Sequence, residues 1–217
     1  MDVANEIRKR GADKEKIASY AMKNPECIAQ LIEGVTAPKG SIRFGYEKVL
    51  RLISEQRPEL IYPYFDVFKD LSGCDNSFLK WGAIMTIANL AAADSENKFD
   101  AIFEEYYAPI RGPVMVSAAN IIGSSAKIAS SKPYMTQKIV REILKVEEAQ
   151  FQMHGKPSPE CRNVALGHAI DTFDQFFDQI EDKAAIIEFV KRQLKNTRKQ
   201  VVKKAEKFLK KHSTNSL

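Results

Sequence analysis

The chain has 217 residues, of which 44% are hydrophobic and 28% are charged. This composition excludes a disordered chain, a collagen-like rod and a disulfide-rich scaffold. Lys and Arg (33) exceed Asp and Glu (28), and the net charge of +5 indicates a mild preference for nucleic acid or membrane surfaces only if it is concentrated on one surface.

Apolar residues recur with helical spacing along nearly the whole chain. In the segment 58–71, for example, Leu60, Ile61, Tyr64 and Phe65 follow the i, i+3, i+4 rule. No segment shows period-two alternation between hairpin turns, so no strand is predicted and the expected fold class is all-α. The expected helices span residues 3–10, 13–22, 25–36, 41–56, 58–71, 76–92, 96–109, 113–130, 134–150, 159–178, 182–195 and 198–211.

After the short opening segment, the predicted helices pair into hairpins, and the second helix of each pair carries a shared pattern. A long or polar residue is followed three positions later by a packing residue, and seven positions later by another. The sets are Arg43/Tyr46/Leu50, Lys80/Ala83/Ile87, Val114/Ser117/Ile121, Arg162/Ala165/Ala169 and Arg198/Val201/Ala205. They begin 37, 34, 48 and 36 residues apart, which is typical of a helical solenoid, where each hairpin buries its apolar face against its neighbours. Small residues are expected where these helices cross: Gly82, Ala83, Ser117, Ala118, Ala165 and Gly167.

At these residues the sequence resembles the HEAT-repeat family. That family has a proline near the start of the first helix, matched by Pro25, Pro58 and Pro133, and an arginine early in the second, matched by Arg43, Arg162 and Arg198. Lys80 and Val114 replace the arginine in the other two hairpins. The resemblance covers about residues 13–212. It implies a right-handed α-α superhelix of about five hairpins in one domain, 1–217, with an N-terminal segment (about 1–12) and a disordered tail (about 213–217).

The 48-residue interval predicts roughly a dozen inserted residues within 147–159, where the helical period is lost. We interpret them as an extended helix end followed by a longer loop. The alternative is a functional loop that projects from one edge, because long loops in repeat proteins often carry function.

The excess positive charge lies at the C-terminal end of the chain. Residues 1–180 hold 22 basic and 24 acidic residues, a net −2, whereas residues 181–217 hold 11 basic and 4 acidic residues, a net +7. The basic patch of the last helix consists of Arg198, Lys199, Lys203, Lys207 and Lys210. We interpret it as the polar outer face of a terminal capping helix, with nucleic-acid or acidic-partner binding as the alternative.

The sequence contains no GxGxxG, GxxxxGK[ST], HExxH or GxSxG motif, so it predicts no catalytic, cofactor-binding or metal-binding residue. His168, Asp171, Asp174 and Asp178 fall on one helix side, which we interpret as an acidic solvated face, with a metal site as the alternative. The thiols of Cys27, Cys74 and Cys161 show no disulfide spacing and are expected to be buried. We expect a cytoplasmic location and no membrane partner.

Trp81 is the only tryptophan, and we expect it to pack between repeats. The alternative is base stacking or peptide anchoring. One branch of the HEAT-like superfamily, the alkylpurine DNA glycosylases, is similar in length and basicity and uses aromatic, acidic and arginine residues on a concave cationic face. This sequence lacks a comparable cluster.

The expected function is therefore a non-enzymatic scaffold that binds a protein or peptide along a concave face formed by the second helices. The candidate partner-binding residues, expected to be exposed there, are Arg43, Glu47, Arg51, Lys80, Asn89, Asn120, Asn163 and Asp171. The alternative is a nucleic-acid-binding protein, including a DNA glycosylase-like enzyme, that uses the basic patch of the last helix.

Overall fold

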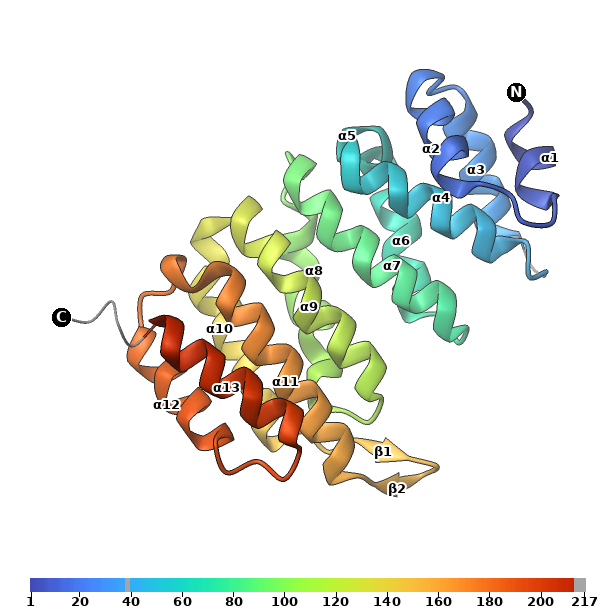
Figure 1. Ribbon diagram of the computed structural model, residues 1–217. Coiled ribbons are helices and arrows are strands. Elements are labelled where there is room, and N and C mark those ends of the chain that lie inside the picture. Colours follow the sequence, from blue (N-terminus) through green and yellow to red (C-terminus); the bar gives the residue numbers. More distant parts are fainter. Residues whose placement is uncertain (38–39, 213–217) are drawn as a thin grey trace. The chain divides into compact units, whose positions relative to one another are not determined.

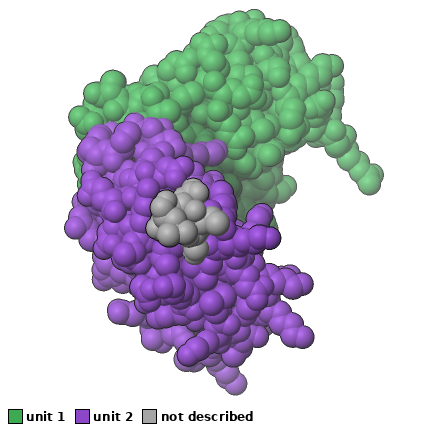
Figure 2. Space-filling view, turned by 60° about the vertical axis from the view of Figure 1, so that its left-hand side comes forward, with its two compact units in different colours: residues 1–101 green, residues 102–217 purple. Residues whose placement is uncertain are grey.

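The computed structural model describes residues 1–37 and 40–212 (Figure 1). These residues are almost entirely helical, which confirms the predicted all-α class. The chain divides into two compact units, unit 1 (residues 1–101) and unit 2 (residues 102–217), which Figure 2 colours separately. The expected single domain and its superhelical path stay predictions. The expected disordered tail, 213–217, lies outside the described residues.

Unit 1 consists of short helices joined by tight turns. Its elements are α1 (Val3–Arg8), α2 (Lys14–Lys23), α3 (Cys27–Thr36), α4 (Arg43–Gln56), α5 (Pro58–Ile61), η1 (Tyr62–Tyr64), α6 (Phe65–Gly73), α7 (Ser77–Leu90) and η2 (Ala91–Ala93), and α8 (Lys98–Tyr107) continues from it into unit 2. Helix α4 packs against α2, α3 and α7, and α6 packs against α7. The two second helices of unit 1, α4 and α7, are therefore direct neighbours.

Local sequence explains where these helices begin and break. The side chain of Asp13 accepts a hydrogen bond from the backbone N–H of Lys16 (2.9 Å), and that of Asn76 accepts one from Leu79 (3.1 Å), so both helices have side-chain N-caps. The prediction of one continuous helix over 58–71 is wrong, because the helix is interrupted. Pro63 cannot donate the helical hydrogen bond, and the chain passes through the 3₁₀ turn η1 before α6 begins.

Unit 2 contains the longer helices and a small hairpin. Its elements are η3 (Ala108–Arg111), α9 (Met115–Ser131), η4 (Pro133–Met135), α10 (Thr136–Leu144), η5 (Lys145–Glu148), β1 (Gln152–Met153), β2 (Lys156–Pro157), α11 (Pro159–Phe176), η6 (Phe177–Gln179), α12 (Lys183–Gln193) and α13 (Lys199–His212). Helix α11 packs between α9 and α13, and these three helices lie side by side in Figure 1. The hydroxyl of Thr172 on α11 donates a buried hydrogen bond to the carbonyl of Ile122 on α9 (3.0 Å).

The packing residues predicted from the repeat pattern are all buried. They are Tyr46, Leu50, Ala83, Ile87, Ser117, Ile121, Ala165, Ala169, Val201 and Ala205. The small residues predicted at the crossings are buried too, and two lie against a neighbouring second helix: Gly82 against Glu47, and Gly167 against Val201. The predicted burial of these positions is therefore confirmed, and the repeat itself stays a prediction.

The prediction of no strand is wrong in the inserted segment. There η5 extends the helical stretch to Glu148, after which β1 and β2 form an antiparallel pair with Gln152 opposite Pro157. His154 and Gly155 both have positive φ (53° and 73°), as a two-residue hairpin turn requires. The base of the hairpin is held to the body, because the N–H of Gln152 donates to the carbonyl of Pro113 (2.9 Å). The expected irregular loop is thus an ordered hairpin, too short to leave a periodic signal.

Candidate protein-binding surface

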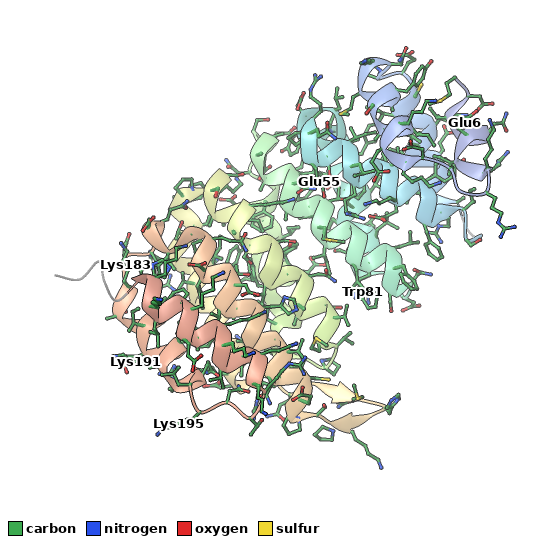
Figure 3. All side chains as sticks on the ribbon, viewed as in Figure 1. Glu6, Glu55, Trp81, Lys183, Lys191 and Lys195 are labelled. Carbon is green, nitrogen blue, oxygen red and sulfur yellow. The ribbon has the colours of Figure 1, made fainter. Side chains whose placement is uncertain are left out.

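Three aromatic side chains form an exposed cluster on the outward side of α4 and α7. Phe78 is 66% exposed and Phe44 is 37% exposed, whereas Trp81 is half-buried near the N-terminal end of α7 (Figure 3). The ring centroids of Phe44 and Phe78 lie 5.5 Å apart, and those of Phe78 and Trp81 lie 5.7 Å apart. These separations fall in the range of favourable aromatic pairs. We call Phe44, Phe78 and Trp81 the aromatic cluster.

The accessible side of the first half of α7 carries an apolar row. Phe78, Trp81 and Met85 are spaced i, i+3 and i+7, so they lie on one side of the helix. Phe78 is exposed, and Trp81 and Met85 are partly exposed. The rest of α7 packs against α4 and α6. A surface helix normally presents polar residues to water on its outward side. An apolar outward row of this kind is typical of a surface that binds another molecule.

Charged residues follow Phe44 along α4. Arg51 Nε donates to Glu47 Oε1 (3.1 Å), and a terminal nitrogen of Arg51 lies 3.7 Å from Glu55. Burial raises the pKa of Glu47, and Arg51 opposes that shift. Lys48 follows Phe44 by one helical turn and is partly exposed. The aromatic cluster therefore has a polar border on its α4 side, as interfaces with an apolar centre and a polar rim do.

Two of the predicted partner-binding residues of unit 1 are buried, so the expectation that they are exposed is wrong. Glu47 is 8% exposed against α7, and Asn89 is 6% exposed and donates to Ser54 Oγ (2.9 Å). Both side chains lie where α4 and α7 pack together, so neither faces outward. Arg43, Arg51 and Lys80 are partly exposed, and Arg43 Nε donates to the carbonyl of Val35 (2.8 Å).

Two of the three predicted partner-binding residues of unit 2, Asn163 and Asp171, connect α11 to the segment of α13. Asn163 on α11 donates to Thr197 Oγ1 (3.0 Å), just before α13. The carboxylate of Asp171 pairs with the ammonium of Lys204 on α13. Asn120 is partly exposed and donates to the carbonyl of Val116 in its own helix (3.0 Å). The structure thus gives Asn163 and Asp171 a role in docking α13 onto α11, although Asp171 keeps an exposed side.

The interpretation of the acidic residues of α11 as a solvated face is wrong in part. Asp171 and Asp174 pair with lysines of α13, and the carboxylate of Asp174 also accepts a hydrogen bond from His212 Nε2 (2.6 Å). His212 is buried, and its ring lies 4.2 Å from that of Phe177 and 4.5 Å from that of Phe208. Within residues 1–37 and 40–212, no group of three or more His, Cys, Asp or Glu side chains is arranged to hold a metal ion.

The predicted basic patch divides into two parts. Arg198 pairs with Glu160 on α11, so this guanidinium ties α13 to its neighbour. The other four residues are exposed on the outward side of α13: Lys199, Lys203, Lys207 and Lys210. Part of the charge excess predicted for the end of the chain therefore lies on the outward side of α13, where the exposed carboxylate of Glu206 also lies.

The cysteines follow the expectation only in part. Cys161 is buried, but Cys27 and Cys74 are partly exposed, and all three are free thiols. Burial is the largest cause that raises the pKa of the Cys27 thiol, and the Glu26 carboxylate adds to it. A raised thiol pKa lowers the fraction of thiolate, so Cys27 has no sign of nucleophilic activation.

Comparison with family models, with curated proteins and with solved structures found no match to this chain. The resemblance to HEAT repeats therefore stays a prediction. None of the helices in the described part of the chain is both long enough and apolar enough to cross a membrane.

Sequence reasoning missed Phe44 and Phe78. Each lies in the first turn of a second helix, at a position that is not a packing position of the repeat pattern. A large apolar residue at such a position was the sequence feature that could have indicated their exposure. Trp81 was expected to pack between repeats, with peptide anchoring as the alternative. Its ring contact with the exposed Phe78 places it at the edge of the aromatic cluster rather than fully inside the core.

Proposed function

We propose that this protein is a non-enzymatic scaffold of HEAT-like repeats that binds a protein partner, with the aromatic cluster as its anchor. The second helices carry the repeated packing register, and the proposal joins both units in one right-handed superhelix of about five hairpins. The proposed setting is the cytoplasm. A membrane has no part in it.

The observation that carries the proposal is the exposure of two phenylalanines in mutual contact. Energetically dominant interface residues are enriched in large side chains that fill a pocket on the partner. Phe78, the most exposed ring of the aromatic cluster, is the side chain placed to do so, and the rings of Phe44 and Trp81 contact it. The partly exposed Lys48 and Arg51 supply polar contacts at the border.

Affinity capture followed by quantitative mass spectrometry tests the proposal. The bait is the full chain, compared with the double variant Phe44→Ser/Phe78→Ser. Tyr134→Ser is the matched control, because Tyr134 of unit 2 is 67% exposed, as Phe78 is 66% exposed. We expect a defined protein to be retained by the wild type and the control and depleted about tenfold or more with the double variant.

The reverse pattern would contradict the proposal. If the double variant retains the same proteins in the same amounts as the wild type, the aromatic cluster is not the anchor. Purified partner and chain, measured by calorimetry, then give the affinity directly and separate a direct contact from an indirect one.

A further inference from the structure

A row of three lysines runs along the exposed side of α13. Lys199, Lys203 and Lys207 are spaced four residues apart, so their backbone positions recur about every 6 Å along the helix axis. All three are exposed, and among the residues that the structure describes none pairs with them. We call Lys199, Lys203 and Lys207 the lysine row.

The acidic residues of α11 do not neutralise the lysine row. Asp171 pairs with Lys204, and Asp174 pairs with Lys211 (2.8 Å), on the side of α13 that faces α11. These ion pairs and that of Arg198 with Glu160 fasten α13 to the body of unit 2. The carboxylates of α11 are thus engaged at the junction between the helices. On the outward side of α13 the exposed carboxylate of Glu206 lies near the lysines, which still outnumber it.

A capping role alone does not explain an outward side on which the lysines outnumber the carboxylate of Glu206. A terminal helix needs a polar outer face, but mixed charges serve solubility equally well. Like charges four residues apart repel one another and destabilise a helix. The row contains two such pairs, Lys199 with Lys203 and Lys203 with Lys207. The arrangement therefore has a cost to the fold that an anionic ligand would remove.

The lysine row fits phosphates better than it fits a protein surface. Protein interfaces are built around an apolar centre. On α13 the apolar residues Val201, Ala205 and Phe208 are buried in unit 2, and Val202 and Leu209 are only partly exposed. Ammonium groups are the standard contact to phosphate oxygens in nucleic-acid backbones. Surfaces that bind single strands add aromatic rings on which bases stack. On α13 the ring of Phe208 is buried against that of Phe177, with 5.2 Å between the ring centroids, so it is not exposed for stacking.

We propose that the lysine row binds the phosphate backbone of double-stranded nucleic acid without sequence preference. The charge of unit 2 as a whole favours this partner, because its 19 basic and 13 acidic residues give a net +6. In Figure 3, Lys191 and Lys195 lie at the same end of unit 2 as α13. Lys191 pairs with Glu188 (2.7 Å), whereas the exposed Lys195 adds positive potential there. This surface is separate in sequence and in unit from the aromatic cluster, so the inference does not depend on the proposed function.

Fluorescence anisotropy with a labelled 20-base-pair duplex tests the proposal, using the full chain at 50 and 200 mM salt. The test variant is Lys203→Glu/Lys207→Glu. The matched control is Lys23→Glu/Lys156→Glu, which changes the net charge equally at two exposed lysines outside α13. We expect the wild type and the control to bind the duplex at 50 mM salt and the test variant to bind at least about tenfold more weakly. The slope of the logarithm of the binding constant against the logarithm of salt concentration should be shallower by about 1.8 for the test variant, the value for two lost phosphate contacts.

Three results would overturn the proposal. The first is no duplex binding by the wild type at 50 mM salt. The second is an equal loss in the test and control variants, which would show a response to net charge alone. The third is tighter binding of a poly-glutamate peptide or of single-stranded nucleic acid than of the duplex. Circular dichroism melting curves for both double variants confirm that folding is unchanged.

Discussion

The carboxylate of Glu47 on α4 lies directly against the backbone of Gly82 on α7, and a methyl group on residue 82 would overlap with Glu47 Oε1. Glycine is required here by close approach, since the site leaves no room for a side chain. The carboxylate is buried at the same point and keeps Arg51 as its partner (3.1 Å). One contact therefore sets both the distance between two second helices and the environment of a buried charge.

Gly82→Ala should destabilise unit 1, because the added methyl group forces Glu47 and α4 away from α7. We expect a loss of about 1–3 kcal/mol in the free energy of unfolding, measured with chemical denaturant. Glu47→Ala should restore part of that loss in the double variant, since the two residues are in contact and their effects do not add. Gly123→Ala is the matched control. Gly123 is exposed on α9 with open space around it, so alanine should stabilise by about 0.5–1 kcal/mol. A Gly82→Ala variant as stable as the wild type would show that the helices can separate freely.

The buried carboxylate of Glu47 should make stability fall as the pH rises. Burial raises its pKa in the folded state above the ordinary value of about 4.3. The folded chain then binds the proton more tightly than the unfolded chain does. This contribution is fully present below the unfolded pKa and is lost as the pH rises through the folded pKa. We expect Glu47→Gln to gain stability relative to the wild type between pH 4 and pH 7. Unfolding curves at both pH values measure this difference. A gap that is constant, or that changes in the opposite direction, would contradict the assignment.

Asp174 should give the opposite pH dependence at the other end of the chain. Burial tends to raise its pKa, but hydrogen bonds from Lys211 and His212 outweigh burial and lower it. A carboxyl with a lowered folded pKa contributes stability above its unfolded value of about 3.9, and this stability is lost as the pH falls through the folded pKa. Asp174→Asn should therefore be less stable than the wild type at pH 7, and the two should converge in acid. Persistence of the full difference below pH 3 would show that Asp174 acts by packing rather than by charge.

The sequence predicted the helices and their buried register because burial leaves a periodic trace. Positions such as Tyr46 and Leu50 repeat at the helical period, and the same offsets return in each second helix. Breaks were harder to place. Pro63 divides a helix whose apolar pattern continues through it, and the hairpin at residues 152–157 has two paired residues per strand, too few for alternation to be visible.

The candidate site was predicted less well, because helical spacing does not reveal what lies opposite each side chain. Glu47 on α4 faces α7, and Asn89 on α7 faces α4, so both of these polar side chains are buried. Phe44 and Phe78 are apolar, as core residues are, but both side chains lie outside the core. Likewise, Lys204 and Lys203 are adjacent in sequence. Only packing onto α11 separates the lysine paired with Asp171 from the lysine that faces solvent.

The aromatic cluster should be detectable without any partner. An apolar dye such as ANS fluoresces on binding exposed hydrophobic surface, and the rings of Phe44 and Phe78 offer such a surface on the folded chain. We expect Phe44→Ser/Phe78→Ser to reduce dye fluorescence well below that of the wild type, while Tyr134→Ser leaves it nearly unchanged because Tyr134 stands outside the cluster. The melting temperature of the double variant should stay within a few degrees of the wild type, since Phe78 is mostly exposed and its removal leaves the core intact. Equal fluorescence from the double variant and the wild type would mean that the dye, and by extension an apolar partner, binds elsewhere. A large loss of stability would instead show that these rings belong to the core of unit 1.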